Sequence, residues 1–193
     1  MASVTHEVFN QPPPLCGHDA AAADLALLEG IEREGGRDRL DEVHHIGRLA
    51  GDPRWIRAGE LANTNPPVLH THDRAGHRID RVEYHPAYHE LVDVAVGEGL
   101  AGAPWADAGA APHVIRAAKF AIWTQVEAGH GCPISMTYSI VPALRAAPEA
   151  STEWEPLLTS RRYDSDDVGA VGTGGRAKVG ALAGMAMTEK QGG

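Results

Sequence analysis

The sequence predicts a mainly α-helical domain followed by the first strand of a β domain. Apolar residues recur every three or four positions between residues 19 and 163, and Asp, Pro and Gly mark the predicted helix ends. An acidic, Gly-rich stretch follows at 164–177, and residues 178–188 then alternate in the manner of a strand. The chain of 193 residues is long enough for one domain, or for one domain and part of another.

Composition and charge narrow the class of protein. Hydrophobic residues make up 43% of the chain and charged residues 22%, which is typical of a globular protein. The net charge of −9 makes the chain a poor binder of nucleic acid, because phosphate binding needs clustered Lys and Arg. No run of roughly 18 apolar residues predicts a membrane span. The segment Met1 to Glu7 lacks a secretory signal, and two cysteines make no disulfide framework, so we expect a cytoplasmic protein.

The first part of the chain is predicted to form an extended arm over residues 1–18. Three prolines follow Gln11 there, and each lacks the backbone donor that a helix needs. Helix signals come next, each with an Asp at the start and Gly or Pro beyond the end. They predict three helices with the approximate bounds Asp19–Gly35, Asp38–Ala50 and Asp52–Asn65.

Residues 68–84 depart from the helical pattern. Two stretches there flank the turn-like tetrapeptide Asp73-Arg74-Ala75-Gly76, which predicts a small hairpin or an irregular loop. Helix signals then return at prolines, which suit the first turn of a helix. They predict helices that start at His85-Pro86, Pro112 and Cys132-Pro133.

The helical domain is predicted to extend over residues 19–163. Pro142 is expected to kink the helix that contains it. Thr152 and Glu155 fit a capping box, which predicts a short last helix. The stretch 164–177 is predicted to be a linker.

Residues 178–193 are predicted to be the start of an incomplete β domain. Small and apolar side chains alternate between the two faces of the strand predicted over residues 178–188. A strand needs neighbours to satisfy its backbone donors and acceptors. The other strand candidates lie only at 68–84, so the partners of this strand are expected outside the chain.

Eleven histidines raise the question of a metal site. His85 and His89 are four residues apart, as helical zinc ligands would be. Pro86 places His85 at the helix cap, away from the face of His89, and occupies the position of the Glu in a His-Glu-x-x-His site. We therefore predict histidines that are solvated or hydrogen-bonded, and no metal ligand.

Other reactive groups are assigned structural roles. Cys132 lies near a predicted helix start, where the dipole lowers a thiol pKa, but it is interpreted as a packed small residue. The glycines at 172–175 precede a strand, whereas a dinucleotide fingerprint follows one, so they are placed in the linker. Glu127 and Glu153 have the chemistry of general bases but are predicted on solvated helix faces.

The last ten residues carry the most informative signal. A strand that ends in Thr188-Glu189 before a Gly-rich turn presents backbone amides and a hydroxyl group. A flavin ring or a pyrophosphate can accept hydrogen bonds from such groups. A plain strand and turn would have the same pattern.

The segment from Met187 to Gly193 resembles the flavin-contacting signature of the acyl-CoA dehydrogenase family, in the form found in its adaptive-response, AidB-like branch. Strings along nearly the whole chain are similar to that branch. They lie at residues 5–12, 61–67, 84–89, 125–129, 132–137 and 162–165.

The resemblance implies the N-terminal helical domain of a three-domain subunit, followed by the opening strand of the middle β domain. It implies bound FAD, a homotetramer when full length, and oxidation of acyl-CoA thioesters between the α and β carbons. In that family a carboxylate removes the α proton while the β hydride passes to the flavin. By resemblance, Met185, Met187 and Thr188 would line the flavin, and Thr188 would donate a hydrogen bond to it. Gly192 and Gly193 would allow close approach of the turn.

By the same resemblance, the catalytic carboxylate and the DNA-binding region belong to a C-terminal part that this chain lacks. We therefore assign no catalytic residue and expect no DNA binding from this chain alone. The expected function is that of the N-terminal part of an FAD-dependent acyl-CoA dehydrogenase-like oxidoreductase, with a link to the DNA-damage response in the full-length branch. The alternative is a non-catalytic orphan helical module from a truncated gene, which acts only through protein contacts.

Overall fold

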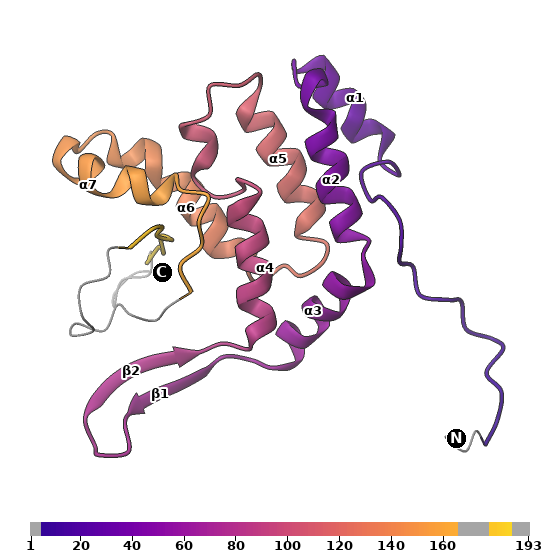
Figure 1. The fold of residues 1–193 in the computed structure, drawn as a ribbon, viewed down its shortest axis with the longest axis horizontal. Helices are drawn as coiled ribbons and strands as arrows, with labels where there is room; N and C mark the ends of the chain where they lie inside the picture. Colours follow the sequence, from indigo (N-terminus) through magenta and orange to yellow (C-terminus); the bar gives the residue numbers. More distant parts are fainter. Residues whose placement is uncertain (1–4, 166–177, 187–193) are drawn as a thin grey trace, which may run out of the picture.

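The mainly helical class is confirmed. The computed structural model describes residues 5–165 and 178–186 (Figure 1). The described elements, in chain order, are α1 (Leu25–Arg33), a 3-10 turn (Arg37–Arg39), α2 (Leu40–Ala50), α3 (Pro53–Thr64), β1 (Val68–His72), β2 (Arg78–Glu83), α4 (Pro86–Gly97), a 3-10 turn (Ala103–Trp105), α5 (Pro112–Trp123), α6 (Gly131–Leu144) and α7 (Pro148–Leu158). No helix in these described ranges is long and apolar enough to cross a membrane.

Proline together with a side-chain cap starts two of the described helices, α3 and α4, as predicted. Pro53 begins α3, and the Asp52 carboxylate accepts a hydrogen bond from the amide of Arg54 at 2.7 Å. Pro86 begins α4, and Nδ1 of His85 accepts one from the amide of Ala87 at 3.1 Å. His85 is therefore a cap, which confirms the prediction made from Pro86.

Two helix starts differ from the prediction. Asp24 caps α1 by accepting from the Leu27 amide at 2.9 Å, while Asp19 caps only the preceding turn at Ala21 and Ala22. Helix α7 begins at Pro148, so Thr152 lies inside it and donates to the Pro148 carbonyl at 2.8 Å. Local capping patterns recur along this chain, and packing decides which one is used.

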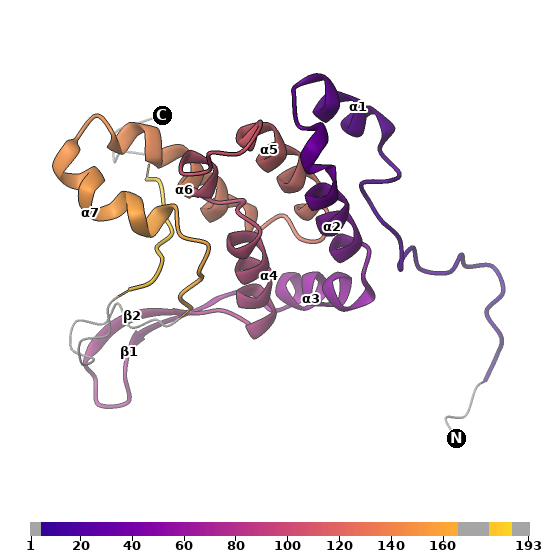
Figure 2. The same cartoon turned by 45° about the horizontal axis from the view of Figure 1, so that its top comes forward.

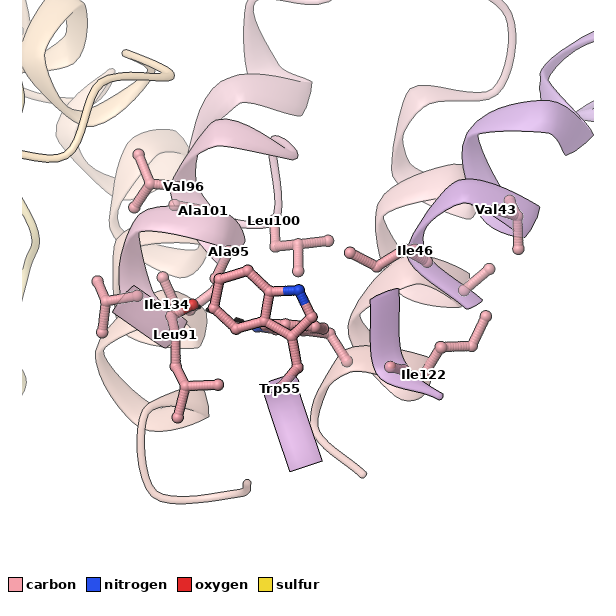
Figure 3. Packing of buried hydrophobic residues seen from close by; sticks show 14 of the residues in the cluster. Val43, Ile46, Trp55, Leu91, Ala95, Val96, Leu100, Ala101, Ile122 and Ile134 are labelled. Atoms are coloured by element: carbon pink, nitrogen blue, oxygen red, sulfur yellow. Dashed lines mark hydrogen bonds between the residues drawn. The ribbon is translucent and has the colours of Figure 1, made fainter. Parts of the chain in front are cut away.

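The core lies where α2 packs on α5 and α3 packs on α4, and α6 covers one side (Figure 2). In Figure 3 the Trp55 indole lies between the Leu91 face of α4 and the Ile46 and Ile122 side chains of α2 and α5. Trp55 also meets the Trp123 ring edge-on at a centroid distance of 5.6 Å. These buried apolar side chains supply the main stabilising term of the fold.

The predicted hairpin is confirmed. Strands β1 and β2 are antiparallel, with Leu69 opposite Val82, and a bulge interrupts the register between His70 and His72. Every residue of both strands is exposed, and the hairpin projects from the helical body (Figure 1).

The base of the N-terminal arm is fastened to α2. The Gly17 amide donates to the Gly51 carbonyl at 2.6 Å, and Asp19 contacts Nδ1 of His44 at 2.8 Å. A Cβ at Gly51 would strike the His18 carbonyl, so the close approach requires glycine there. From residue 17 back to residue 5 the chain is exposed and runs away from the body (Figure 1).

The strand predicted over residues 178–188 is not formed in its described part, residues 178–186. No strand lies beside this segment within the described chain, so its backbone groups bond to the helical domain instead. The Ala181 amide donates to the Leu157 carbonyl at 3.1 Å, and the Ala183 amide donates to the Thr137 hydroxyl at 2.9 Å. The predicted linker at 164–177 lies outside the described residues except for its first two positions.

Candidate functional site

A cavity of about 800 Å³ opens between α3, α4, α6 and the segment 183–185. We call it the α3–α4–α6 cavity. Its size is that of pockets that hold small molecules or cofactors. Its walls are formed by Ala62, Asn63, Asn65, Pro66, Pro67, Tyr84, His85, Tyr88, Glu127, Gly129, Cys132, Pro133, Met136, Ala183, Gly184 and Met185.

Two stacked tyrosines form one wall of the cavity. The rings of Tyr84 and Tyr88 have centroids 4.3 Å apart and an interplanar angle of 16°. The spacing of four residues across the start of α4 brings them together. Burial, with smaller effects from neighbouring acidic groups beginning with Tyr84, raises the pKa of Tyr88 to about 12. This wall is therefore flat and uncharged at neutral pH.

Glu127 lies in the wall of the cavity and is buried, which corrects the prediction of a solvated helix face. Its carboxylate accepts hydrogen bonds from the Gly129 amide at 2.6 Å and from the amide and Nδ1 of His130 at 2.8 and 2.9 Å. Burial alone would raise the pKa of Glu127, but these hydrogen bonds together lower it. The group is an ionised cap that fixes the loop from α5 to α6, and its bonds leave it poorly suited to remove a proton from a ligand.

Cys132 stands at the start of α6 and is exposed in the wall of the cavity, rather than packed as predicted. Met136, one turn further along α6, and Met185 also line the cavity. Thioether sulfur is polarizable and adapts to aromatic and aliphatic ligands. This side of the cavity therefore complements the flat aromatic wall.

Among the described residues, the cavity wall contains no Lys or Arg, and its one acidic side chain, Glu127, is already engaged. An uncharged ring or an aliphatic chain fits these surroundings, whereas the described part of the wall offers no cation to a phosphate.

The histidines do not converge on a metal site in the described part of the chain, where no group of three or more His, Cys, Asp or Glu residues could hold an ion. His89 contacts the Tyr163 hydroxyl at 2.8 Å, and His70 contacts Glu83 at 2.9 Å. These are hydrogen-bonded pairs of the kind that the sequence predicted.

The structure places one of the five predicted cofactor-binding residues. Met185 lies in the cavity wall and is 61% exposed. Met187, Thr188, Gly192 and Gly193 lie outside the described residues. The cavity thus reaches the described end of the segment that carries the predicted flavin contacts.

Sequence reasoning did not select Tyr84, Tyr88 or Met136 as site residues. The aromatic pair at a spacing of four around a helix start was a usable signal. The Met136 side of the wall had no such signal, because it depends on how α6 meets the segment after residue 178.

Residues 10–165 match the model of a protein family described as the adaptive response protein AidB N-terminal domain. The chain belongs to the AidB N-terminal domain family. This match covers most of the chain and includes α3, α4 and α6, the three helices of the cavity.

Similar proteins extend the AidB relationship. The chain is 42% identical over 191 residues to AidB of Escherichia coli (strain K12), which is provisionally assigned as an acyl-CoA dehydrogenase. The match covers 98% of this chain and 34% of that protein. The apo form of Bd2924 is 26% identical with a TM-score of 0.72, over 80% of this chain and 32% of that one. Caenorhabditis elegans ACDH-11, solved in complex with C11-CoA, has the same fold at 21% identity and a TM-score of 0.69, over 84% of this chain and 29% of that one. The chain therefore spans about a third of the length of these relatives.

Proposed function

We propose that this chain forms the N-terminal helical part of an FAD-dependent acyl-CoA dehydrogenase-like oxidoreductase, and that the α3–α4–α6 cavity faces the flavin and the acyl group. The position of Met185 carries this proposal. Met185 lines the cavity and precedes by two residues the Met187-Thr188 pair that resembles the flavin contacts of the family. The solved complex of ACDH-11 with C11-CoA supports an acyl-CoA as the substrate class.

The walls of the cavity fit the uncharged parts of these ligands. Stacked Tyr84 and Tyr88 offer a flat surface to a ring, and Met136 and Met185 offer thioethers to a ring edge or an acyl chain. The phosphates of FAD and of coenzyme A need cations that the described residues of this wall do not supply, so we expect other residues to hold them.

When bound, FAD supplies the hydride acceptor for α,β-dehydrogenation of an acyl-CoA thioester. This chain contributes the surroundings of that step: it positions an uncharged group and keeps water away from it. No residue of the chain is assigned to removal of the α proton. Glu127, the one carboxylate among the described residues of the cavity wall, already accepts hydrogen bonds from the amides of Gly129 and His130.

For the longer protein that the relatives represent, we also propose a homotetramer in the cytoplasm with a role in the response to DNA damage. These proposals rest on membership of the AidB N-terminal domain family and on the length of the relatives.

The first test is the intact mass of the polypeptide from its own cell, followed by its visible absorbance. A mass above 20.5 kDa together with a flavin spectrum is the expected result. A longer product that stays colourless after addition of FAD would contradict the proposal. A mass of 20.5 kDa would favour the non-catalytic orphan module instead.

The second test uses the two cysteines as internal probe and control. Cys132 lines the cavity, whereas Cys16 lies in the exposed arm, and both thiols are exposed. In the flavin-loaded protein, octanoyl-CoA should slow alkylation of Cys132 by N-ethylmaleimide and leave the rate at Cys16 unchanged. Equal rates at Cys132 with and without octanoyl-CoA would show that the acyl group does not enter this cavity.

A further inference from the structure

The α3–α4–α6 cavity is lined by a histidine whose proton position is fixed by its own helix. His85 lies in the cavity wall and is half-buried. Its Nδ1 accepts a hydrogen bond from the Ala87 amide at 3.1 Å and so caps α4. An amide can only donate, so Nδ1 carries a lone pair and the single proton of the neutral ring is on Nε2. Apart from its cap, the ring of His85 therefore offers a donor and no acceptor.

This donor has no acceptor in the described part of the chain. Among the described residues, none accepts a hydrogen bond from Nε2 of His85. Glu127 is the one carboxylate among the described residues of the wall, and it already accepts from the amides of Gly129 and His130. Water can accept this hydrogen bond until a ligand displaces it. A ligand that fills the cavity must then bring its own acceptor, because a buried donor without a partner is costly.

The surroundings of His85 favour an uncharged acceptor. The described residues of the wall include no Lys or Arg to pair with an anion, and the ionised Glu127 would repel one. The residues on either side of His85 along the wall are Tyr84 and Tyr88, whose stacked rings offer a flat apolar surface. A carbonyl oxygen on an otherwise apolar group meets both conditions.

We propose that Nε2 of His85 donates a hydrogen bond to the thioester carbonyl oxygen of the bound acyl-CoA. The inference rests on the proposed function, which brings an acyl-CoA to this cavity, and it adds the residue that recognises the thioester rather than the chain. His85 acts here as a binding residue and neither gains nor loses a proton. A carbonyl group of the flavin is the other acceptor that the proposed function brings to the cavity, and the experiment separates the two.

A pair of ligands tests the contact. Octanoyl-CoA and S-octyl-CoA share the coenzyme and the number of chain carbons, but S-octyl-CoA has a methylene group in place of the carbonyl group. The dissociation constant of each follows from how it slows alkylation of Cys132 by N-ethylmaleimide in the flavin-loaded longer protein, with oxygen excluded. His85→Asn should weaken octanoyl-CoA by about tenfold or more and change S-octyl-CoA by less than about twofold.

The variants are chosen so that the helix start survives. Asn and Ser are both good helix caps, but their side chains are too short to replace the Nε2 donor, so His85→Ser should repeat the result of His85→Asn. His70→Asn is the matched control, because His70 belongs to β1 and lies outside the residues that form the cavity wall. It should leave both dissociation constants unchanged. Unchanged helical circular dichroism shows that each variant folds.

The possible failures are distinguishable. Equal weakening of both ligands in His85→Asn would reveal a structural role, and unchanged binding of octanoyl-CoA would show that the donor does not contact the thioester. A loss of FAD affinity with an unchanged ratio of the two ligands would assign the donor to the flavin. Each of these results would overturn the proposal. If octanoyl-CoA does not slow alkylation of Cys132 even in the unchanged protein, the proposed function fails first and this contact fails with it.

Discussion

The buried carboxylate of Glu127 lies 2.9 Å from Nδ1 of His130, which is itself 1% exposed. Burial lowers the pKa of His130, and the neighbouring carboxylate only partly offsets this effect. At neutral pH the pair is therefore an ionised Glu127 and a neutral His130. The Nδ1–H of His130 donates the hydrogen bond to the Glu127 carboxylate.

This pair predicts loss of stability in acid. The pKa of His130 is lowered below its ordinary value of 6.5, so below that pH the unfolded chain binds a proton that the folded chain does not. The lowered pKa of Glu127 adds a second loss below its ordinary value of 4.5. Urea unfolding should give a smaller free energy of unfolding at pH 5 than at pH 7.5. In His130→Gln, which keeps a donor but does not titrate, the difference should shrink; an undiminished difference would point to other groups.

Removal of the Glu127 charge should destabilise the loop from α5 to α6. Glu127→Gln replaces one oxygen that accepts from backbone amides with a donor, and we expect a loss of about 2–3 kcal/mol. Glu153→Gln, a change of the same kind on α7, serves as the control and should change stability by less than about 0.5 kcal/mol. Equal effects would show that the buried hydrogen bonds of Glu127 contribute nothing.

Gly59 lies where α3 meets the loop after α5. A Cβ at this position would strike the Val126 carbonyl oxygen, which is backbone and has little room to move. Gly59→Ala should lower the free energy of unfolding by about 1–3 kcal/mol, despite the better helix propensity of Ala. Gly97→Ala is the matched change in α4, where a Cβ meets no atom within 4 Å, and it should be neutral or stabilising.

Lys119 is buried in α5, and its ammonium lies 2.9 Å from Glu98 and 3.6 Å from Glu42. The lysine cannot reach water, whereas the side chains of Glu98 and Glu42 are 25% and 38% exposed. Glu98→Gln together with Glu42→Gln should therefore cost about 3 kcal/mol, because a buried cation loses its partners. Lys119→Met leaves only carboxylates that water can reach and should cost less, about 1 kcal/mol. Thermal unfolding of both variants measures the two losses. A larger loss of stability in Lys119→Met than in the double Glu→Gln variant would disprove this account.

The raised pKa of Tyr88 predicts a loss of stability in alkali. The folded state holds the phenol proton to a pH of about 12, against 10 for an unperturbed tyrosine. Its stabilising contribution is complete below pH 10 and is lost as the pH rises through 12. Tyr88→Phe should remove a step near pH 12 from an ultraviolet titration of the folded protein, and a step that persists in the variant would contradict this assignment.

Local sequence signals predicted most of the helix starts because proline and a capping side chain act within one turn. Pro53, Pro86 and Pro112 begin helices as expected, and the turn at residues 73–76 joins two strands. Asp19 and Asp24 have the same side chain, so the sequence does not show which of them caps α1. The contact of Asp19 with His44 of α2 holds Asp19 at the base of the arm and leaves the cap of α1 to Asp24.

The candidate site was less predictable because its walls come from distant parts of the chain. Burial of Glu127 depends on packing of the α5–α6 loop against α3, which no periodicity reveals. The alternation after residue 178 is present in the sequence, but the described part of the chain offers no partner strand to residues 178–186, and their backbone bonds to Thr137 and Leu157 instead. Resemblance indicated Met185, and the structure added Tyr84 and Tyr88, which line the same cavity.

The hydrogen bond from the Ala183 amide to the hydroxyl of Thr137 has a consequence for protein engineering. The helices that enclose the cavity all end before residue 145, yet one wall belongs to residues 183–185. A chimaera that transplants only residues 19–163 into another scaffold would carry the helices and leave the cavity open on one side. Recombination between members of this family should therefore preserve all walls of the cavity only when the crossover falls after residue 185.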